Sequence, residues 1–117
     1  MLDRIRSWLP GAVKKEPAKL TLEGSELLEW VNQKRSLTLL DVRDQKAYRG
    51  GHVKGSVLIP GSELPQRMHE LRSDQLIVVL ADSEAKAFKA ARTMRQAGLE
   101  VMHLKGGIQA WPGKIVK

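Results

Sequence analysis

From residue 19 onward, short apolar segments alternate with segments whose apolar residues recur at helical spacing. Continuous apolar runs are typical of strands buried on both faces of a parallel sheet. Strands that alternate with amphipathic helices are typical of an α/β layer fold. The pattern predicts strands at residues 20–22, 37–42, 57–59, 76–80 and 101–104. We therefore expect a single α/β domain over residues 19–117, with a mostly parallel five-stranded sheet and helices on both faces.

The segments between the strands predict helices at residues 25–33, 62–71 and 84–97, a helical turn at 45–49 and a short helix or turn at 107–111. In the helix at 62–71, Ser62 is expected to be the N-cap, and Pro65 is tolerated in the first turn. Its inward face should consist of Leu64, Met68 and Leu71. The helix at 84–97 is expected to end at Gly98, because glycine readily adopts the conformation that closes a helix.

Residues 1–18 differ from the rest and are expected to form an extension in front of the domain. Ile5, Trp8 and Leu9 recur at helical spacing, which predicts a short amphipathic helix over residues 3–9. A proline ends this pattern, and a polar linker follows. Because so short a helix is marginal in water, its apolar face should be buried. We expect it to dock on the domain, with a partner protein or a lipid surface as the alternatives.

The composition fits one small folded domain of 117 residues, with enough apolar residues for a single core. The net charge of +7 attracts phosphates at long range, but the basic residues are spread along the chain and few aromatic residues accompany them. We therefore expect no specific nucleic-acid binding. No apolar run approaches the ~18 residues of a transmembrane segment, and early charges interrupt any signal peptide. The expected location is cytoplasmic, with weak membrane-surface association through residues 1–9 left open.

Two motifs carry a resemblance to a known family. The first comprises residues 39–43 (LLDVR) and 51–60 (GHVKGSVLIP), and the second is residues 104–111 (LKGGIQAW), which close the α/β pattern. Over residues 19–112 the chain resembles the rhodanese-like (sulfurtransferase) domain family. The resemblance implies the same α/β fold, with a sulfur-accepting cysteine in the loop after the strand at 76–80.

That cysteine is missing. The resemblance places it at Ala81, and no cysteine occurs anywhere in the sequence. Where the family loop carries a glycine that eases tight wrapping, this chain has Glu84 or Ala85. The usual arginine is Lys86, a point charge without the planar fork that grips an oxyanion. Because a methyl group forms no persulfide, the sequence predicts no catalytic residue and no sulfur transfer.

The rest of the loop favours a structural role. Ligands gather at the carboxyl ends of parallel strands, and helix N-termini attract anions. Asp82 and Glu84 would nevertheless repel an anionic substrate, and Lys86 offsets only one charge. We expect Asp82 or Ser83 to cap the following helix and Glu84 to complement its dipole. The candidate binding residues at this edge of the sheet are Asp82, Ser83, Glu84, Ala85, Lys86, Arg43 and His52.

Asp41, Arg43 and His52 match positions that recur in the family. Asp41 is expected to accept hydrogen bonds from the turn at Gly51 and His52. In the family a glutamate commonly precedes the aromatic residue of this motif, whereas here Ala47 precedes Tyr48. Arg43 is therefore expected to lose one supporting salt bridge and to be freer. His52 is expected to be structural, since it has no partnered nucleophile. No ligand spacing links it to the other histidines, and we expect neither a metal nor another cofactor.

Lys86, Lys89, Arg92 and Arg95 recur every third residue along the helix expected at 84–97. Such a stripe is usually only the solvated face of a helix. Because this helix begins at the former active-site loop, the stripe is also suited to docking an acidic partner.

These observations predict a catalytically inactive rhodanese-like domain that serves as a protein-binding or regulatory module, with a partner in sulfur trafficking, where the family works. Two alternatives stay open. One is a thiosulfate or persulfide sulfurtransferase whose cysteine, at position 81, 85 or 87, was replaced by alanine. The other is a non-catalytic module that senses a small anion.

Overall fold

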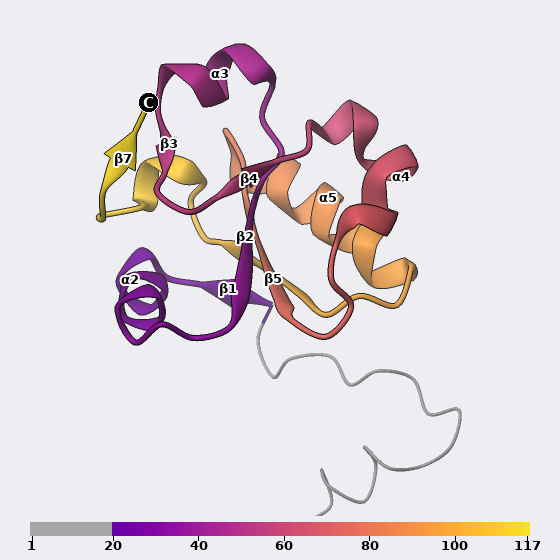
Figure 1. Cartoon of the computed structure of the whole chain (residues 1–117), viewed down its shortest axis with the longest axis horizontal. Coiled ribbons are helices and arrows are strands. Elements are labelled where there is room, and N and C mark those ends of the chain that lie inside the picture. Colours follow the sequence, from indigo (N-terminus) through magenta and orange to yellow (C-terminus); the bar gives the residue numbers. More distant parts are fainter. Residues whose placement is uncertain (1–19) are drawn as a thin grey trace, which may run out of the picture.

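The computed structural model describes residues 20–117, and in this part of the chain five strands form one sheet (Figure 1). In the order of their hydrogen bonding they are β1 (Thr21–Leu22), β6 (Val101–Leu104), β5 (Leu76–Leu80), β2 (Leu37–Asp41) and β4 (Val57–Leu58). All neighbouring strands are parallel. The predicted sheet is confirmed, with every strand end within one residue of its predicted place. The predicted extension at residues 1–18, with its helix at 3–9, lies outside the described residues.

Helices cover both faces of the sheet, as predicted. The covering helices are α2 (Gly24–Asn32), α4 (Leu64–Arg67) and α5 (Glu84–Gln96), whereas α3 (Gln45–Gly50) has no buried residue and contributes to neither core. Figure 1 shows α4 and α5 on one side of the sheet and α2 on the other. Side chains of β5 alternate between these layers, with Ile77 and Val79 in the core beneath α4 and α5, and Val78 and Leu80 in the core beneath α2. Because both faces of β5 are buried, its sequence is apolar throughout.

The segment expected as one helix over residues 62–71 is broken into three pieces. A 3-10 helix at Gly61–Glu63 precedes α4, and a second at Met68–Glu70 follows it. Ser62 lies within the first piece and is therefore not the N-cap that we predicted. Pro65 in the first turn of α4 has no N–H and restricts the residue before it, which explains why a single regular helix does not form. The predicted inward face is confirmed by the packing of Leu64, Met68 and Leu71 on one core.

A second, two-stranded sheet was not predicted. β3 (His52–Val53) pairs antiparallel with β7 (Ile115–Val116), so that His52 lies opposite Val116 and Val53 opposite Ile115. Strands of two residues carry no periodic signal that could distinguish them from a turn. The pairing ties the last described residues to the loop that follows α3, which is the loop that carries His52.

The closing motif forms the short helix and turn that we predicted. Gly106 and Gly107 both have φ of +81°, in the left-handed region that favours glycine. A 3-10 helix at Ile108–Ala110 follows them, and Trp111 is buried in the core beneath α2. No helix within residues 20–117 has the length and apolar character needed to cross a membrane.

Candidate functional site at the carboxyl edge of the sheet

Ala81 occupies the place where the sequence comparison with the rhodanese family expects the nucleophile. It directly follows β5, is only 1% exposed, and packs in the same core as Ile77 and Val79. Its carbonyl oxygen accepts a hydrogen bond from the backbone N–H of Ile108 (2.8 Å). The backbone at position 81 is thus held against the closing turn, and its side chain contributes a methyl group to the core.

Ser83 is the N-cap of α5. Its side-chain oxygen accepts a hydrogen bond from the backbone N–H of Lys86 (3.3 Å), and its carbonyl accepts one from Ala87 (3.1 Å). This confirms the predicted cap. Residues 81–83 are all that separates β5 from α5, so the connection is a short turn stabilised by its own polar groups.

Glu84, in the first turn of α5, joins this helix to β6. Its Oε1 accepts a hydrogen bond from the backbone N–H of Gly106 (3.2 Å), and its Oε2 lies 3.3 Å from Nε2 of His103. A carboxylate can only accept, so Nε2 must carry the hydrogen. Sequence reasoning missed these contacts because Glu84 is 19 and 22 residues from its partners and no short motif links them.

His103 lies on β6 and its side chain is 3% exposed. Burial lowers its pKa, and the hydrogen bond to Glu84 opposes that shift. Within residues 20–117, no group makes a hydrogen bond with its Nδ1. A second proton would therefore place a charge on a buried nitrogen that has no acceptor. This explains why the effect of burial on the pKa of His103 outweighs that of the hydrogen bond to Glu84.

The polar side chains that the loop presents to water carry a net negative charge. Asp82 and Lys86 lie 3.9 Å apart, with side chains 51% and 70% exposed, and form a solvated pair. Glu84 adds a second carboxylate, with its side chain 43% exposed. Gln109 donates a hydrogen bond to the carbonyl of Asp82 (3.0 Å), which leaves that carbonyl occupied. An incoming anion would meet two carboxylates and one ammonium group.

A pocket of about 350 Å³ opens beside this loop, on the face of the sheet covered by α4 and α5. It is lined by Val42, Gly61, Ser62, Leu64, Pro65, Lys86, Lys89, Ala90 and Thr93. Most of these residues offer apolar surface, whereas Lys86 and Lys89 supply ammonium groups. The pocket is suited to an apolar side chain that is followed or preceded by a carboxylate.

The stripe of basic residues on α5 is shorter than predicted. Lys86, Lys89 and Arg92 are exposed, in agreement with the helical pattern. Arg95 instead turns back to the sheet, where its Nε and Nη2 donate to the carbonyl of Val101 (3.2 and 3.0 Å). The solvated part of the stripe therefore lies at the end of α5 nearest the loop.

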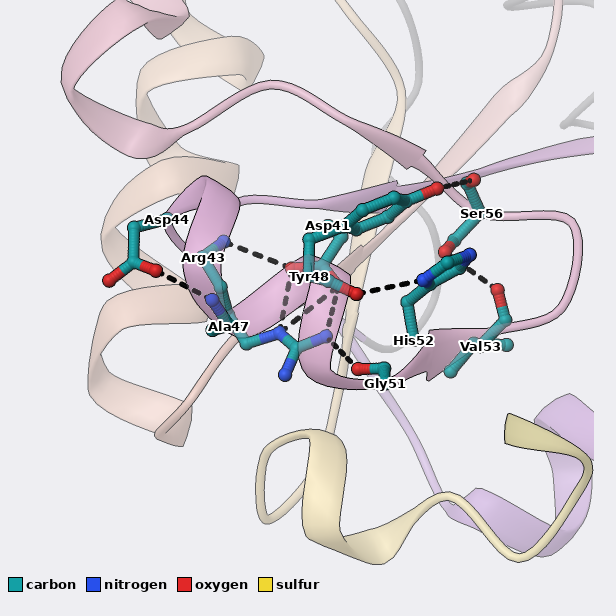
Figure 2. Close-up of polar contacts among 9 residues, drawn as sticks. All are labelled: Asp41, Arg43, Asp44, Ala47, Tyr48, Gly51, His52, Val53 and Ser56. Carbon is teal, nitrogen blue, oxygen red and sulfur yellow. Dashed lines mark hydrogen bonds and ion pairs between the residues drawn. The ribbon is translucent and has the colours of Figure 1, made fainter. Parts of the chain in front are cut away.

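Arg43 is held on two sides, which corrects the expectation that it is freer: Figure 2 shows its side chain bound to Asp41 and to Gly51. Its Nε and Nη2 bind both carboxylate oxygens of Asp41, and Nη2 also donates to the carbonyl of Gly51 (2.8 Å). Asp41 is fully buried, and it accepts the backbone N–H of Arg43 as well (3.0 Å). The hydrogen bonds to Asp41 raise the pKa of Arg43. Arg43 is thus paired with Asp41, although Ala47 stands where the family commonly has a glutamate.

Asp41 reaches the turn at Gly51 only through Arg43, which corrects the direct hydrogen bonds that we expected. His52 is held separately (Figure 2). Its Nδ1 donates to the carbonyl of Tyr48 (2.8 Å), and its ring stacks on the Tyr48 ring with centroids 3.8 Å apart. Tyr48 in turn donates its hydroxyl to the carbonyl of Ser56 (2.6 Å). These contacts order residues 43–56, and in this arrangement Arg43 and His52 support the edge of the sheet.

The rhodanese-like domain family matches residues 23–114, and the chain belongs to this family. It is 39% identical over 82 residues to the uncharacterized protein YqhL of Bacillus subtilis, covering 69% of this chain and 65% of that protein. It is 32% identical over 94 residues to a Mycobacterium tuberculosis protein named "Probable adenylyltransferase/sulfurtransferase MoeZ", covering 78% of this chain and 24% of that protein.

The fold also agrees with a solved structure. A rhodanese-related protein from Thermoplasma volcanium superposes with a TM-score of 0.76 at 27% identity, covering 84% of this chain and 98% of that chain. The two curated relatives are longer than their matched regions, since this chain spans less than two thirds of one and about a quarter of the other.

Proposed function

We propose that this chain is a non-catalytic rhodanese-like domain that acts by binding a protein partner, in a regulatory role, at the carboxyl edge of its sheet. The observation that carries the proposal is Ala81, a buried methyl group at the end of β5 in a chain without cysteine. Covalent sulfur transfer needs a nucleophile that can be loaded with sulfur, and no side chain of this chain supplies one.

The surroundings of Ala81 also disfavour the family reaction. Asp82 and Glu84 add two carboxylates to the residues that follow Ala81, which disfavours an anion such as thiosulfate, and Lys86 lacks the bidentate geometry of an arginine. The same charges disfavour the anion-sensing alternative. A loop altered at several positions is more consistent with loss of the reaction during evolution than with the replacement of one residue.

The pocket beside the loop supports a peptide-like partner. Its apolar surface suits an apolar side chain, and Lys86 and Lys89 suit a neighbouring acidic residue. The name of the mycobacterial relative supports placing the partner in sulfur handling. A partner with an exposed segment of mixed apolar and acidic residues fits these features best.

The catalytic part of the proposal is tested with a thiosulfate:cyanide sulfurtransferase assay. The unmodified chain should form no thiocyanate above a heat-inactivated control, and Ala81→Cys alone should restore little. Adding Asp82→Ala, Glu84→Gly and Lys86→Arg to Ala81→Cys should raise turnover, because the charges that oppose thiosulfate are then removed. Ala97→Cys, at an exposed position at the far end of α5, is the control for a cysteine outside the loop.

Turnover of Ala81→Cys at the level of an ordinary family enzyme would contradict this proposal. It would show that the loop is still competent and would favour the alternative of an active sulfurtransferase with a replaced cysteine.

The binding part is tested by selecting displayed peptides of mixed apolar and acidic sequence. Selected peptides should lose affinity when Lys86 and Lys89 are both changed to glutamate. Changing Lys34 and Lys46 to glutamate alters the net charge equally at exposed positions that do not line the pocket, and should have little effect. Equal losses of affinity in the two double variants would show that binding depends on net charge alone, and would refute a specific site.

A further inference from the structure

A second pocket lies on the opposite flank of α5. It has a volume of about 330 Å³ and is lined by Leu20, Thr21, Glu84, Ala85, Phe88 and His103. Phe88 is 46% exposed, although its ring meets the buried ring of His103 edge-on, with centroids 6.1 Å apart. A large aromatic residue half out of water beside an apolar hollow leaves room for a further apolar group.

The pocket lies where the described chain begins. Leu20, the first described residue, lines it, and residues 1–19 precede Leu20 in the sequence. Only residues 10–19 separate Leu9 from the pocket wall, a stretch that can extend at most ~35 Å. Because the connection is short, apolar residues of the preceding segment are present near the pocket at a high effective concentration.

The preceding segment also matches the pocket chemically. Ile5, Trp8 and Leu9 recur at helical spacing and offer one apolar face. Arg4 and Arg6 carry the opposite charge to Glu84, which lines the pocket. The two pockets use different residues of α5. Residues 84, 85 and 88 line this pocket, whereas residues 86, 89, 90 and 93 line the pocket that contains Lys86 and Lys89.

We propose that the chain's own segment 5–9 docks in this pocket, with the Trp8 indole against the Phe88 ring. Docking buries an apolar face that a short isolated helix cannot keep in water, and it completes the packing around Phe88. Because it uses the other flank of α5, it leaves the pocket with Lys86 and Lys89 open, and it is independent of the proposed function.

The test uses the fact that Phe88 is the only phenylalanine of the chain. Growth with 4-fluorophenylalanine places one fluorine label at this position of the full chain, which gives one ¹⁹F NMR resonance. Trp8→Ala should move this resonance, because the ring current of the indole and the burial of Phe88 are both lost. Val57→Ala is the control, since Val57 is 48% exposed on β4 at the opposite edge of the sheet.

The outcomes separate the occupants of the pocket. A shift in Trp8→Ala that is larger than in Val57→Ala and unchanged on dilution supports docking within one chain. The proposal is overturned if Trp8→Ala leaves the resonance unmoved, or if the difference disappears on dilution, which would indicate a second copy. It is also overturned if the difference appears only with vesicles of anionic phospholipid, which would indicate a membrane anchor.

Urea unfolding gives a second measurement. Trp8→Ala and Phe88→Ala should each lower the unfolding midpoint, and the double variant should lower it by less than the sum of the two, because the same contact is lost in each. Strictly additive shifts would refute direct packing of Trp8 on Phe88.

Discussion

Replacing Arg43 should destabilise this domain more than replacing any exposed arginine. Asp41 is fully buried, and the Arg43 side chain beside it is only 9% exposed. In Arg43→Ala, the Asp41 carboxylate loses three hydrogen bonds from the guanidinium and, among residues 20–117, keeps only the one from the backbone N–H of residue 43. Removing one partner of a buried ion pair costs about 3–5 kcal/mol, chiefly because the other charge stays buried.

The carbonyl of Gly51 adds to this loss, since it accepts from the same guanidinium. A hydrogen bond of this kind contributes on the order of 1 kcal/mol. The retained backbone N–H of residue 43 works in the opposite direction, so we expect a total of about 4 kcal/mol. For a domain of this size, 1 kcal/mol corresponds to roughly 4 °C or more in Tm. The expected decrease in Tm is therefore on the order of 15 °C.

The assay is urea unfolding followed by tryptophan fluorescence, with Arg67→Ala as the matched control. Arg67 also binds a carboxylate through two hydrogen bonds, to Glu70, and it contacts Glu63 as well, but these groups lie at the surface. Exposed pairs contribute little, so this variant should unfold close to the unmodified protein. Equal midpoints for Arg43→Ala and Arg67→Ala would refute the reasoning from burial.

A second variant keeps the prediction testable if Arg43→Ala does not fold. Replacing the pair together, as Asp41→Leu with Arg43→Met, leaves no unpaired charge in the core. Apolar replacements of a buried ion pair are often close to neutral. The double variant should therefore be more stable than Arg43→Ala. If it is less stable than Arg43→Ala, the unpaired carboxylate is not the cause of the destabilisation.

Two further predictions concern the contacts around the loop. Burial lowers the pKa of His103, so the unfolded chain binds the proton more readily, and the stability present above pH 6.5 should fall as the pH is lowered below that value. The free energy of unfolding, measured between pH 8 and pH 5, should fall with pH in the unmodified protein and in His69→Gln, a control at an exposed histidine. It should not fall in this way in His103→Gln. If the fall persists in His103→Gln, another group causes it. Gly107→Ala should lower the urea midpoint more than Gly55→Ala, because both positions have positive φ but only a Cβ at Gly107 would lie 3.1 and 3.2 Å from the carbonyls of Asp82 and Ala81. Equal midpoints for the two variants would rule out the close approach of the closing turn to the loop as the cause.

Much of the fold follows from local patterns in the sequence. The continuous apolar run of β5 predicted a strand buried on both faces, and the two cores on either side of it agree with that prediction. A cap at Asp82 or Ser83 was predicted because a short polar residue followed by an amphipathic segment is a local signal, and the structure assigns it to Ser83. The absence of cysteine was also readable from the sequence alone, and it determined the first conclusion about the chemistry of residue 81.

What the sequence did not predict depends on contacts between distant residues. The pairing of His52 with Val116, the hydrogen bonds of Glu84 to β6, and the two pockets beside α5 all join segments that are far apart in the chain. The missing glutamate of the sequence motif led us to expect a freer Arg43, whereas the fold places the buried carboxylate of Asp41 beside it. Apolar periodicity and capping act over a few residues and are therefore visible in the sequence, but burial and pairing of polar groups are settled only when the strands and helices are brought together.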